Sequence, residues 1–287
     1  MSEHYITRPD LFTPTIIHPF KPLLGAKYEK LASGVEANAH QPNIAVIART
    51  KNDLKGLQKI VENIVWQREH YAGRIDLIVV DTESTDGTVE FATESLATIV
   101  TMKQSEFNYP KGLNIGLEAV EDDVEAAFLT VGHAQMVLKN GLFAAASHFV
   151  DASVTGVYGE TIPSEDVSIW DSLSTSYLGL LAHSSKQITE VKTGVMGANG
   201  AMVRMSTWKE RPFSEDYAGG GEDTHWARLA FQNNEKIIFD PAVAVHHSHR
   251  LSFINHMRQV HHWFTVVDQP TAFDSEAVFK RRPDLDI

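Results

Sequence analysis

The sequence feature that most constrains the fold is a series of four short apolar runs, the first three of which are each followed by a segment with helical character. A run of four to eight apolar residues between turn signals is typical of a buried strand, and apolar residues at helical spacing follow the first run. Strands that alternate with helices pair in parallel within one sheet. The pattern therefore predicts an α/β fold with a mainly parallel sheet flanked by helices. The four runs are Asn43 to Ala48, Ile75 to Val80, Ala97 to Met102 and Ala126 to Thr130.

The second half of the chain is less regular. We expect a strand near Val154 to Tyr158, a helix from Glu222 to Gln232 and a strand at Lys236 to Phe239. A Gly/Asn-rich stretch lies between these elements at Gly194 to Gly200, and an apolar stripe after Ser252 predicts a C-terminal helix.

Composition limits the classes of protein that this chain can belong to. It has 287 residues, 43% of them hydrophobic, enough for one elaborated domain or two fused halves. The absence of cysteine excludes disulfides, thiolate metal sites and cysteine nucleophiles, and it fits a reducing compartment. A net charge of -12 argues against tight nucleic-acid binding. No apolar run approaches the ~20 residues that span a bilayer, so we expect a soluble, cytoplasmic protein, with peripheral contact at the inner face of a membrane left open.

Polar residues follow the predicted strands at the edge where parallel strands bind ligands. Thr50, Asp81, Glu83 and His133 should converge there although they are far apart in the sequence. The segment after the first strand, Ala48 to Asp53, has none of the glycines of a dinucleotide-binding motif or a P-loop. Simple dehydrogenases and NTPases are therefore disfavoured.

Five further segments form an ordered series: Val80 to Thr88, Phe107 to Gly116, Gly197 to Arg204, Glu222 to Trp226 and Pro241 to Ser252. In this order they resemble segments of family 2 glycosyltransferases, and the last of them resembles the rhamnosyltransferase-like members. The resemblance spans residues 43–252 and implies a GT-A fold. It also implies inverting transfer of a sugar from a nucleotide-diphosphate donor to a hydroxyl of a glycan or lipid-linked acceptor, as in polysaccharide biosynthesis.

The resemblance assigns roles to particular residues. Asp223, beside Glu222, is the expected general base, although an acidic pair at a helix N-terminus is also explained by the helix dipole alone. Asn199 and Trp226 are expected on the acceptor side, and for Trp226 two interpretations stay open, stacking on a sugar or filling the core. The residues expected to bind the nucleotide sugar are Thr50, Asp81, Glu83, Lys111, Asn114 and His133.

The metal motif departs from the family pattern. Family members usually carry D-x-D after the fourth strand, whereas this chain has Thr130 to Gln135 with no carboxylate. His133 together with His247 or His249 is a candidate ligand set for a divalent cation, Mn²⁺ or Mg²⁺, and nitrogen ligands suit Mn²⁺ better. A histidine at a strand end is also commonly structural, so both interpretations stay open.

The expected organisation is an irregular N-terminal arm over residues 1–42, a GT-A domain over 43–252, and a C-terminal helix and tail over 253–287. The domain divides into a nucleotide-binding half at 43–135 and an acceptor half at 136–252. The missing acidic motif leaves an alternative, a catalytically inactive nucleotide-sugar-binding protein of the same fold. A nucleotidyltransferase is disfavoured because its Gly-rich loop is absent.

Overall fold

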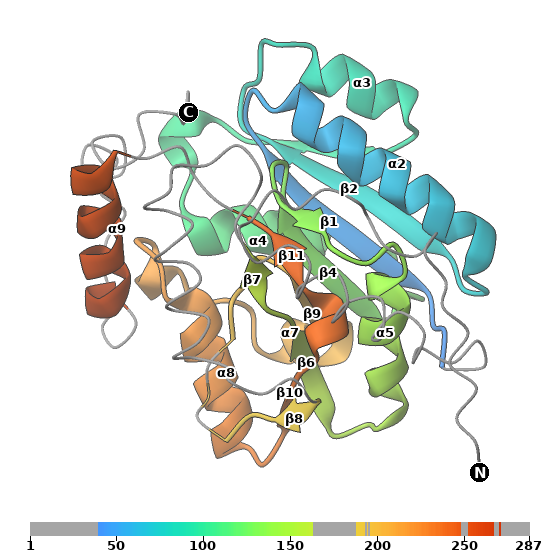
Figure 1. Cartoon of the computed structure of the whole chain (residues 1–287), viewed down its shortest axis with the longest axis vertical. Coiled ribbons are helices and arrows are strands. Elements are labelled where there is room, and N and C mark those ends of the chain that lie inside the picture. Colours follow the sequence, from blue (N-terminus) through green and yellow to red (C-terminus); the bar gives the residue numbers. More distant parts are fainter. Residues whose placement is uncertain are drawn as a thin grey trace.

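The computed structural model describes residues 40–162, 188–192, 194, 196–247, 252–266 and 270, and Figure 1 shows their arrangement. Nearly all of the expected N-terminal arm, the C-terminal tail and His249 lie outside these residues. Among the helices described, none is long and apolar enough to cross a membrane.

An eight-stranded sheet organises the molecule, in the order β3-β2-β1-β4-β9-β6-β10-β8. The first four strands are parallel, as predicted, whereas β9 runs antiparallel to both β4 and β6, and β8 antiparallel to β10. The strands are β1 (Ile44–Thr50), β2 (Ile75–Asp81), β3 (Thr98–Thr101), β4 (Ala126–Val131), β6 (Val154–Tyr158), β8 (Thr189–Glu190), β9 (Ala201–Arg204) and β10 (Lys236–Phe239).

A second, three-stranded sheet in the order β5-β11-β7 lies beside the carboxyl edge of the first. It joins the segment after β4 to the segment before the C-terminal helix, because Val245 pairs with Met136 on one side and with Thr161 on the other. Its strands are β5 (Gln135–Met136), β7 (Thr161–Ile162) and β11 (Val245–His246).

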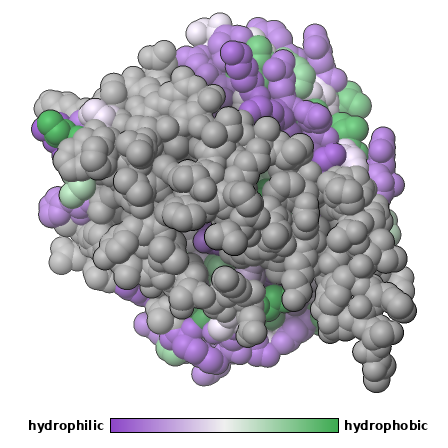
Figure 2. Space-filling view, viewed as in Figure 1, coloured by the Kyte–Doolittle hydropathy of each residue, from purple (hydrophilic) through white to green (hydrophobic). Residues whose placement is uncertain are grey.

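Helices cover both faces of the large sheet and form two separate cores. Alternation along β1 divides its side chains, so that Val46 packs with α2, α3 and α5, while Ile47 packs with α4, α7 and α8. Figure 2 shows the hydrophilic outer surface over α2 and α3. The α-helices are α2 (Leu54–His70), α3 (Thr88–Glu94), α4 (Tyr109–Glu118), α5 (Gly141–Ser147), α7 (Met205–Glu210), α8 (Glu222–Gln232) and α9 (Phe253–Val266). The 3₁₀ helices are η2 (Gln104–Glu106), η3 (His148–Val150), η4 (Glu215–Tyr217) and η5 (Pro241–Val243).

Local signals explain where α4 starts. The side chain of Asn108 accepts a hydrogen bond from the Lys111 amide at 2.7 Å, and Pro110 occupies the first turn, where its missing N–H costs nothing. The helix therefore begins at Tyr109. The predicted limits of β6, α8 and β10 are confirmed.

Candidate active site

The carboxyl ends of β1 and β2 hold a fixed carboxylate. Thr50 pairs with Asp81 in the sheet register, and the Thr50 hydroxyl donates to Asp81 Oδ1 at 3.3 Å. The Ser84 amide donates to Asp81 Oδ2 at 2.9 Å, and the Thr82 amide donates to the Thr50 carbonyl at 3.1 Å. Thr50 and Asp81 are buried, so the Asp81 carboxylate has one orientation. The expected convergence of these two residues is confirmed.

Glu83 and Lys111 lie nearer the solvent than Asp81. Glu83 adopts a left-handed backbone with φ 55°, its carboxylate accepts from the Gln104 amide at 2.9 Å, and its carbonyl accepts from Lys51 Nζ at 2.9 Å. The ammonium of Lys111, which is in the first turn of α4, lies 3.6 Å from the Glu106 carboxylate. Both side chains therefore belong to the surface around the strand ends, and their contacts with a nucleotide stay predictions.

Asn114 is committed to the protein's own scaffold. It is buried, its Oδ1 accepts from Trp208 Nε1 and from the Phe213 amide, both at 3.1 Å, and its Nδ2 donates to the Phe213 carbonyl at 2.8 Å. These bonds join α4 to α7 and to the segment that follows α7. The structure gives Asn114 a structural role, and the predicted nucleotide contact remains untested.

His133 and His247 lie together beyond the end of β4. Their rings stack with centroids 5.0 Å apart and planes inclined by 21°. His133 Nδ1 lies 3.4 Å from Asp53 Oδ2, and His247 Nε2 lies 3.4 Å from Asn199 Nδ2. Sequence reasoning missed Asp53, although its position as N-cap of α2 was a readable signal.

The residues described do not complete a protein-only metal centre. No group of three His, Cys, Asp or Glu side chains that could hold a metal ion occurs among them. His133 and His247 bring two imidazoles together, which fits the nitrogen part of the predicted set, and the third predicted ligand, His249, is not among the described residues. Cation binding therefore stays a proposal.

The acidic pair begins α8. Gly220 and Gly221, with φ of 121° and 89°, turn the chain so that the helix starts at Glu222. The Asp223 carboxylate accepts from the Ala198 amide through Oδ2 and from the Thr224 amide through Oδ1, both at 2.7 Å. It is thus anchored between the N-terminus of α8 and the segment that leads into β9.

Burial changes the acidity of both carboxyl groups. The pKa of Glu222, which is 4% exposed, is raised to about 8, first by burial and then by the neighbouring Asp223. Burial also raises the pKa of Asp223, but the amides of Ala198 and Thr224 and the charge of Arg49 counteract it. Glu222 therefore holds a proton near neutral pH, and Asp223 has the contacts that favour a carboxylate.

Arg49 is the residue near this pair that sequence reasoning missed. Its Nη1 donates to the Tyr109 carbonyl at 3.2 Å, and its buried Nε has no hydrogen-bond partner among the described residues. Burial lowers the pKa of its guanidinium, whereas the charges of Glu222 and Asp223 oppose that change. The signal was a cation one residue before the end of an apolar strand, on the face shared by Ala45 and Ile47.

The position of Trp226 corrects the prediction that this residue binds the acceptor. Its side chain is 0% exposed, its Nε1 donates to the Arg211 carbonyl at 2.8 Å, and its ring packs against Phe213 with centroids 5.9 Å apart. No face of the indole is available to a sugar. Of the two interpretations that the sequence left open, the structure shows core packing and not acceptor stacking.

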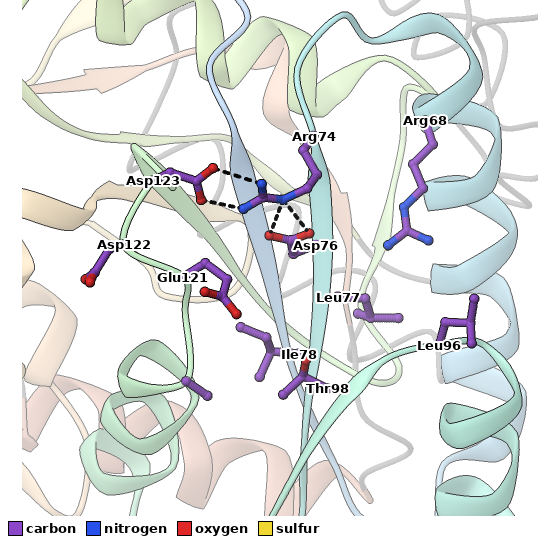
Figure 3. Close-up of a pocket in the computed structure, with 11 residues that line it drawn as sticks. Arg68, Arg74, Asp76, Leu77, Ile78, Leu96, Thr98, Glu121, Asp122 and Asp123 are labelled. Carbon is purple, nitrogen blue, oxygen red and sulfur yellow. Dashed lines mark hydrogen bonds and ion pairs between the residues drawn. The ribbon is translucent and has the colours of Figure 1, made fainter.

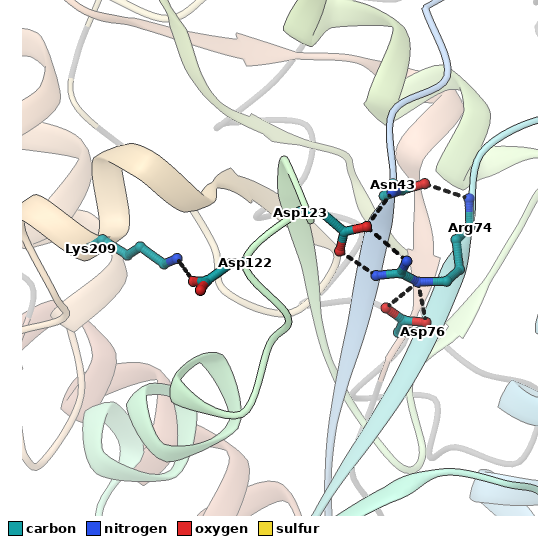
Figure 4. Close-up of polar contacts among 6 residues, drawn as sticks. All are labelled: Asn43, Arg74, Asp76, Asp122, Asp123 and Lys209. Atoms are coloured by element: carbon teal, nitrogen blue, oxygen red, sulfur yellow. Dashed lines mark hydrogen bonds and ion pairs between the residues drawn. The ribbon is translucent and has the colours of Figure 1, made fainter.

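A cavity of about 590 Å³ lies at the opposite edge of the sheet, where β2, β3 and β4 begin. Figure 3 shows Arg74 between Asp76 and Asp123, with Arg68 and the exposed Leu96 on the far wall. Figure 4 shows that the Arg74 guanidinium binds the carboxylates of Asp76 and Asp123, and that Asn43 also binds Asp123. The charge of Arg74 is therefore already neutralised within the protein. Size alone does not make this cavity the active site, because ligands of parallel sheets bind at the carboxyl ends of the strands.

A mixed sheet covered by helices on both faces is the fold of the GT-A glycosyltransferases that this chain resembles. Residues 45–162 match the model of glycosyl transferase family 2. The fold predicted from the sequence is confirmed, and the match over residues 45–162 is to the family that the sequence resembles.

The individual relatives share little sequence identity with this chain. The chain is 28% identical over 178 residues to the O-antigen chain rhamnosyltransferase WbaN of Salmonella anatum, covering 60% of this chain and 56% of that protein. It thus spans little more than half of that relative's length.

Solved structures show the same fold. The mannosyltransferase PcManGT from Pyrobaculum calidifontis, in complex with GDP-Man and Mn²⁺, superposes with a TM-score of 0.59 at 18% identity, covering 88% of this chain and 73% of that one. GalNAc-T7 with UDP, GalNAc and Mn²⁺ superposes with a TM-score of 0.58 at 13% identity, covering 86% and 56%.

Proposed function

We propose that the protein is an inverting glycosyltransferase that moves a sugar from a nucleotide-diphosphate sugar to a hydroxyl of a glycan or lipid-linked acceptor in polysaccharide biosynthesis. The observation that carries this proposal is the Asp223 carboxylate, fixed by two backbone amides at 2.7 Å beside the buried Glu222. The family 2 match and the rhamnosyltransferase activity by which the Salmonella relative is named support the reaction class and the pathway.

In this mechanism Asp223 is the general base. Each of its oxygens accepts one amide hydrogen and keeps a second lone pair, so the carboxylate can take the proton of the acceptor hydroxyl. The acceptor oxygen forms a bond to the anomeric carbon while the bond from that carbon to the diphosphate oxygen breaks. The diphosphate leaves with the electron pair, and attack opposite the leaving group inverts the anomeric configuration.

The donor is assigned to the ends of β1 and β2. Asp81 is fixed by the Thr50 hydroxyl and the Ser84 amide, and its remaining lone pairs suit an N–H group of a nucleotide base. The Lys111 ammonium, half-exposed at the start of α4, is the predicted counter-charge for a diphosphate. Contacts of Glu83 with the donor and of Asn199 with the acceptor belong to the same proposal.

His133 and His247 are the described residues that would hold a divalent cation. Two stacked imidazoles supply too few protein ligands for a closed site, which suits a cation whose other ligands come from the donor. When bound, such a cation neutralises negative charge on the departing diphosphate. The participation of His249 stays a prediction, as does a cytoplasmic location with peripheral membrane contact.

The proposal is tested by comparing binding with turnover. We expect one of UDP, GDP or dTDP to bind in calorimetric titrations, more tightly with Mn²⁺, because every such donor releases its diphosphate. Asp223→Asn should bind this nucleotide within about 3-fold of wild type but lose at least ~10²-fold in transfer, the low end for a general base. Asp216→Asn, a change at an exposed aspartate shortly before α8, is the matched control and should turn over normally.

Two outcomes contradict the proposal. Undiminished transfer by Asp223→Asn would remove this residue from the chemistry. Nucleotide binding without transfer to any hydroxyl acceptor in the wild-type protein would favour the catalytically inactive binding protein instead.

A further inference from the structure

We propose that Arg49 is a positioning residue for the transfer reaction: its guanidinium is the counter-ion that keeps Asp223 as the ionised member of the acidic pair, while Glu222 carries the proton. This inference deepens the proposed function and rests on the assignment of Asp223 as the base. In this proposal Arg49 contacts neither the donor nor the acceptor, and it acts through the Asp223 carboxylate.

The direction of the Arg49 side chain follows from the strand. Alternation along β1 places Arg49 on the same face as Ala45 and Ile47, toward α4 and α8. Its Cδ lies only 3.3 Å from the point where a Cβ on Gly112 of α4 would stand. The side chain therefore runs through a narrow passage between β1 and α4, and the absence of a side chain at position 112 leaves room for it.

Backbone contacts connect Arg49 to both supports of the acidic pair. Its Nη1 binds the Tyr109 carbonyl, and the Tyr109 amide donates to the Ala218 carbonyl at 3.4 Å, just before the glycine turn that starts α8. On the other side, the Arg49 carbonyl accepts from Gly132 at 2.9 Å at the end of β4.

The end of β4 then leads to the second anchor of the base. The Leu129 carbonyl of β4 accepts from the Gly200 amide at 3.0 Å, and the nearby Ala198 amide donates to Asp223. The end of β1 is thus connected through Tyr109 to the turn before α8, and through β4 to the segment that carries Ala198.

The charges allow one ionised carboxylate at this place. Two adjacent buried carboxylates repel each other, and one buried cation compensates one of them. Arg49 stays protonated because a guanidinium does not lose its proton in proteins. Among the described residues, Arg49 from β1 is the charged group that acts on both carboxyl groups, Tyr109 from α4 acts on Arg49, and residues 196–200 add no titratable group.

Hydrogen bonds decide which carboxyl group is ionised. Asp223 accepts two backbone amides at 2.7 Å, and these contacts stabilise a carboxylate over a carboxylic acid. Glu222 is 4% exposed and lies at the same end of the helix. The charge of Arg49 therefore supports Asp223 as the base, which must be unprotonated before the acceptor hydroxyl arrives.

The test is a titration that needs no substrate. Carboxyl ¹³C NMR resonances of Asp223 and Glu222 are assigned with Asp223→Asn and Glu222→Gln and followed against pH in wild type, Arg49→Met and Arg49→Lys. In Arg49→Met we expect the Asp223 midpoint to rise by about one pH unit or more, the usual effect of losing a neighbouring opposite charge. Arg49→Lys keeps the charge and should leave the midpoint near that of wild type.

Kinetics give a second readout. The acid limb of the kcat profile of Arg49→Met should move upward with the Asp223 midpoint, while the KM for the donor changes by less than about 3-fold. An unchanged Asp223 midpoint in folded Arg49→Met overturns the inference. If Arg49→Met does not fold, the inference is overturned when folded Arg49→Lys shows a midpoint raised by about one unit or more.

The two proposals fail in different ways. If wild type transfers no sugar but its Asp223 midpoint depends on the charge at position 49, the proposed function fails and the counter-ion role stands. If transfer occurs and depends on Asp223, but the titration midpoint of Asp223 does not change with the charge at position 49, the counter-ion role alone fails.

Discussion

At the scale of single residues, two adjacent carboxyl groups acquire different chemistry from their surroundings. Glu222 and Asp223 follow each other in the sequence, yet Asp223 accepts two short amide hydrogen bonds while burial dominates the acidity of Glu222. The sequence identified the pair and chose Asp223 by resemblance. It could not supply the reason, because Ala198 and Arg49, which tune the pair, lie 25 and 174 positions from Asp223 along the chain.

The raised pKa of Glu222 makes a prediction about stability and pH. A carboxyl group whose pKa is higher in the folded state binds its proton more tightly there than in the unfolded chain. Its contribution to stability is therefore present at low pH and is lost as pH rises from the ordinary value of 4.5 to about 8. We expect the free energy of unfolding of wild type to fall across this range, relative to Glu222→Gln, by at most about 1.4 kcal/mol per pH unit.

Denaturant titrations at several pH values measure this difference. Glu90→Gln, at an exposed glutamate on α3, is the control and should follow wild type at every pH. A constant difference between wild type and Glu222→Gln from about pH 5 to pH 8, within the range of the expected loss, would show that Glu222 titrates as it does in the unfolded chain.

At the scale of elements, the sequence predicted the parallel half of the sheet because each strand there is a local apolar run. It did not predict that β9 inserts antiparallel between β4 and β6, since the Ala201 to Arg204 segment resembles any short apolar stretch and its partners are distant. Trp226 shows the same limit. An aromatic residue one turn into a helix suits a sugar or a core equally, and only the packing of Phe213 and Arg211 decides.

Asn114 of α4 provides a test at this scale, because a contact with the nucleotide and a structural role predict different results. Asn114→Ala removes bonds to Trp208 and Phe213 and leaves their buried polar groups unpaired, which should cost about 1–3 kcal/mol or more of unfolding free energy. Nucleotide affinity should stay within about 3-fold of wild type at a temperature where the variant is folded.

Lys111→Ala, on the half-exposed side of the same helix, is the matched comparison. It should change stability by less than about 0.5 kcal/mol and weaken nucleotide binding, because it removes a surface charge beside the proposed diphosphate site. Calorimetric titration and chemical unfolding measure both quantities. Normal stability with strongly reduced affinity in Asn114→Ala would restore Asn114 as a direct nucleotide contact.

At the scale of the whole molecule, the sheet has two edges with different chemistry. The carboxyl edge carries Asp81, the stacked His133 and His247, and the approach to Asp223. The opposite edge carries the 590 Å³ cavity, where ion pairs already satisfy Arg74. Because a continuous sheet joins β2 to β9 through β1 and β4, the proposed donor side and the segment that supports the proposed base lie along one edge of that sheet, and a nucleotide there should order both sides together.

Hydrogen exchange distinguishes the two edges. With saturating nucleoside diphosphate and Mn²⁺, we expect slower exchange in peptides that contain the amides of Thr82 and Ser84, and in the segment after β4. Peptides over 73–76 and 121–125, which border the cavity, should exchange at an unchanged rate. Protection confined to those peptides would place the nucleotide in the cavity and remove the carboxyl edge as the donor site, whereas protection that extends to Ala198 would show that donor binding also orders the support of the base.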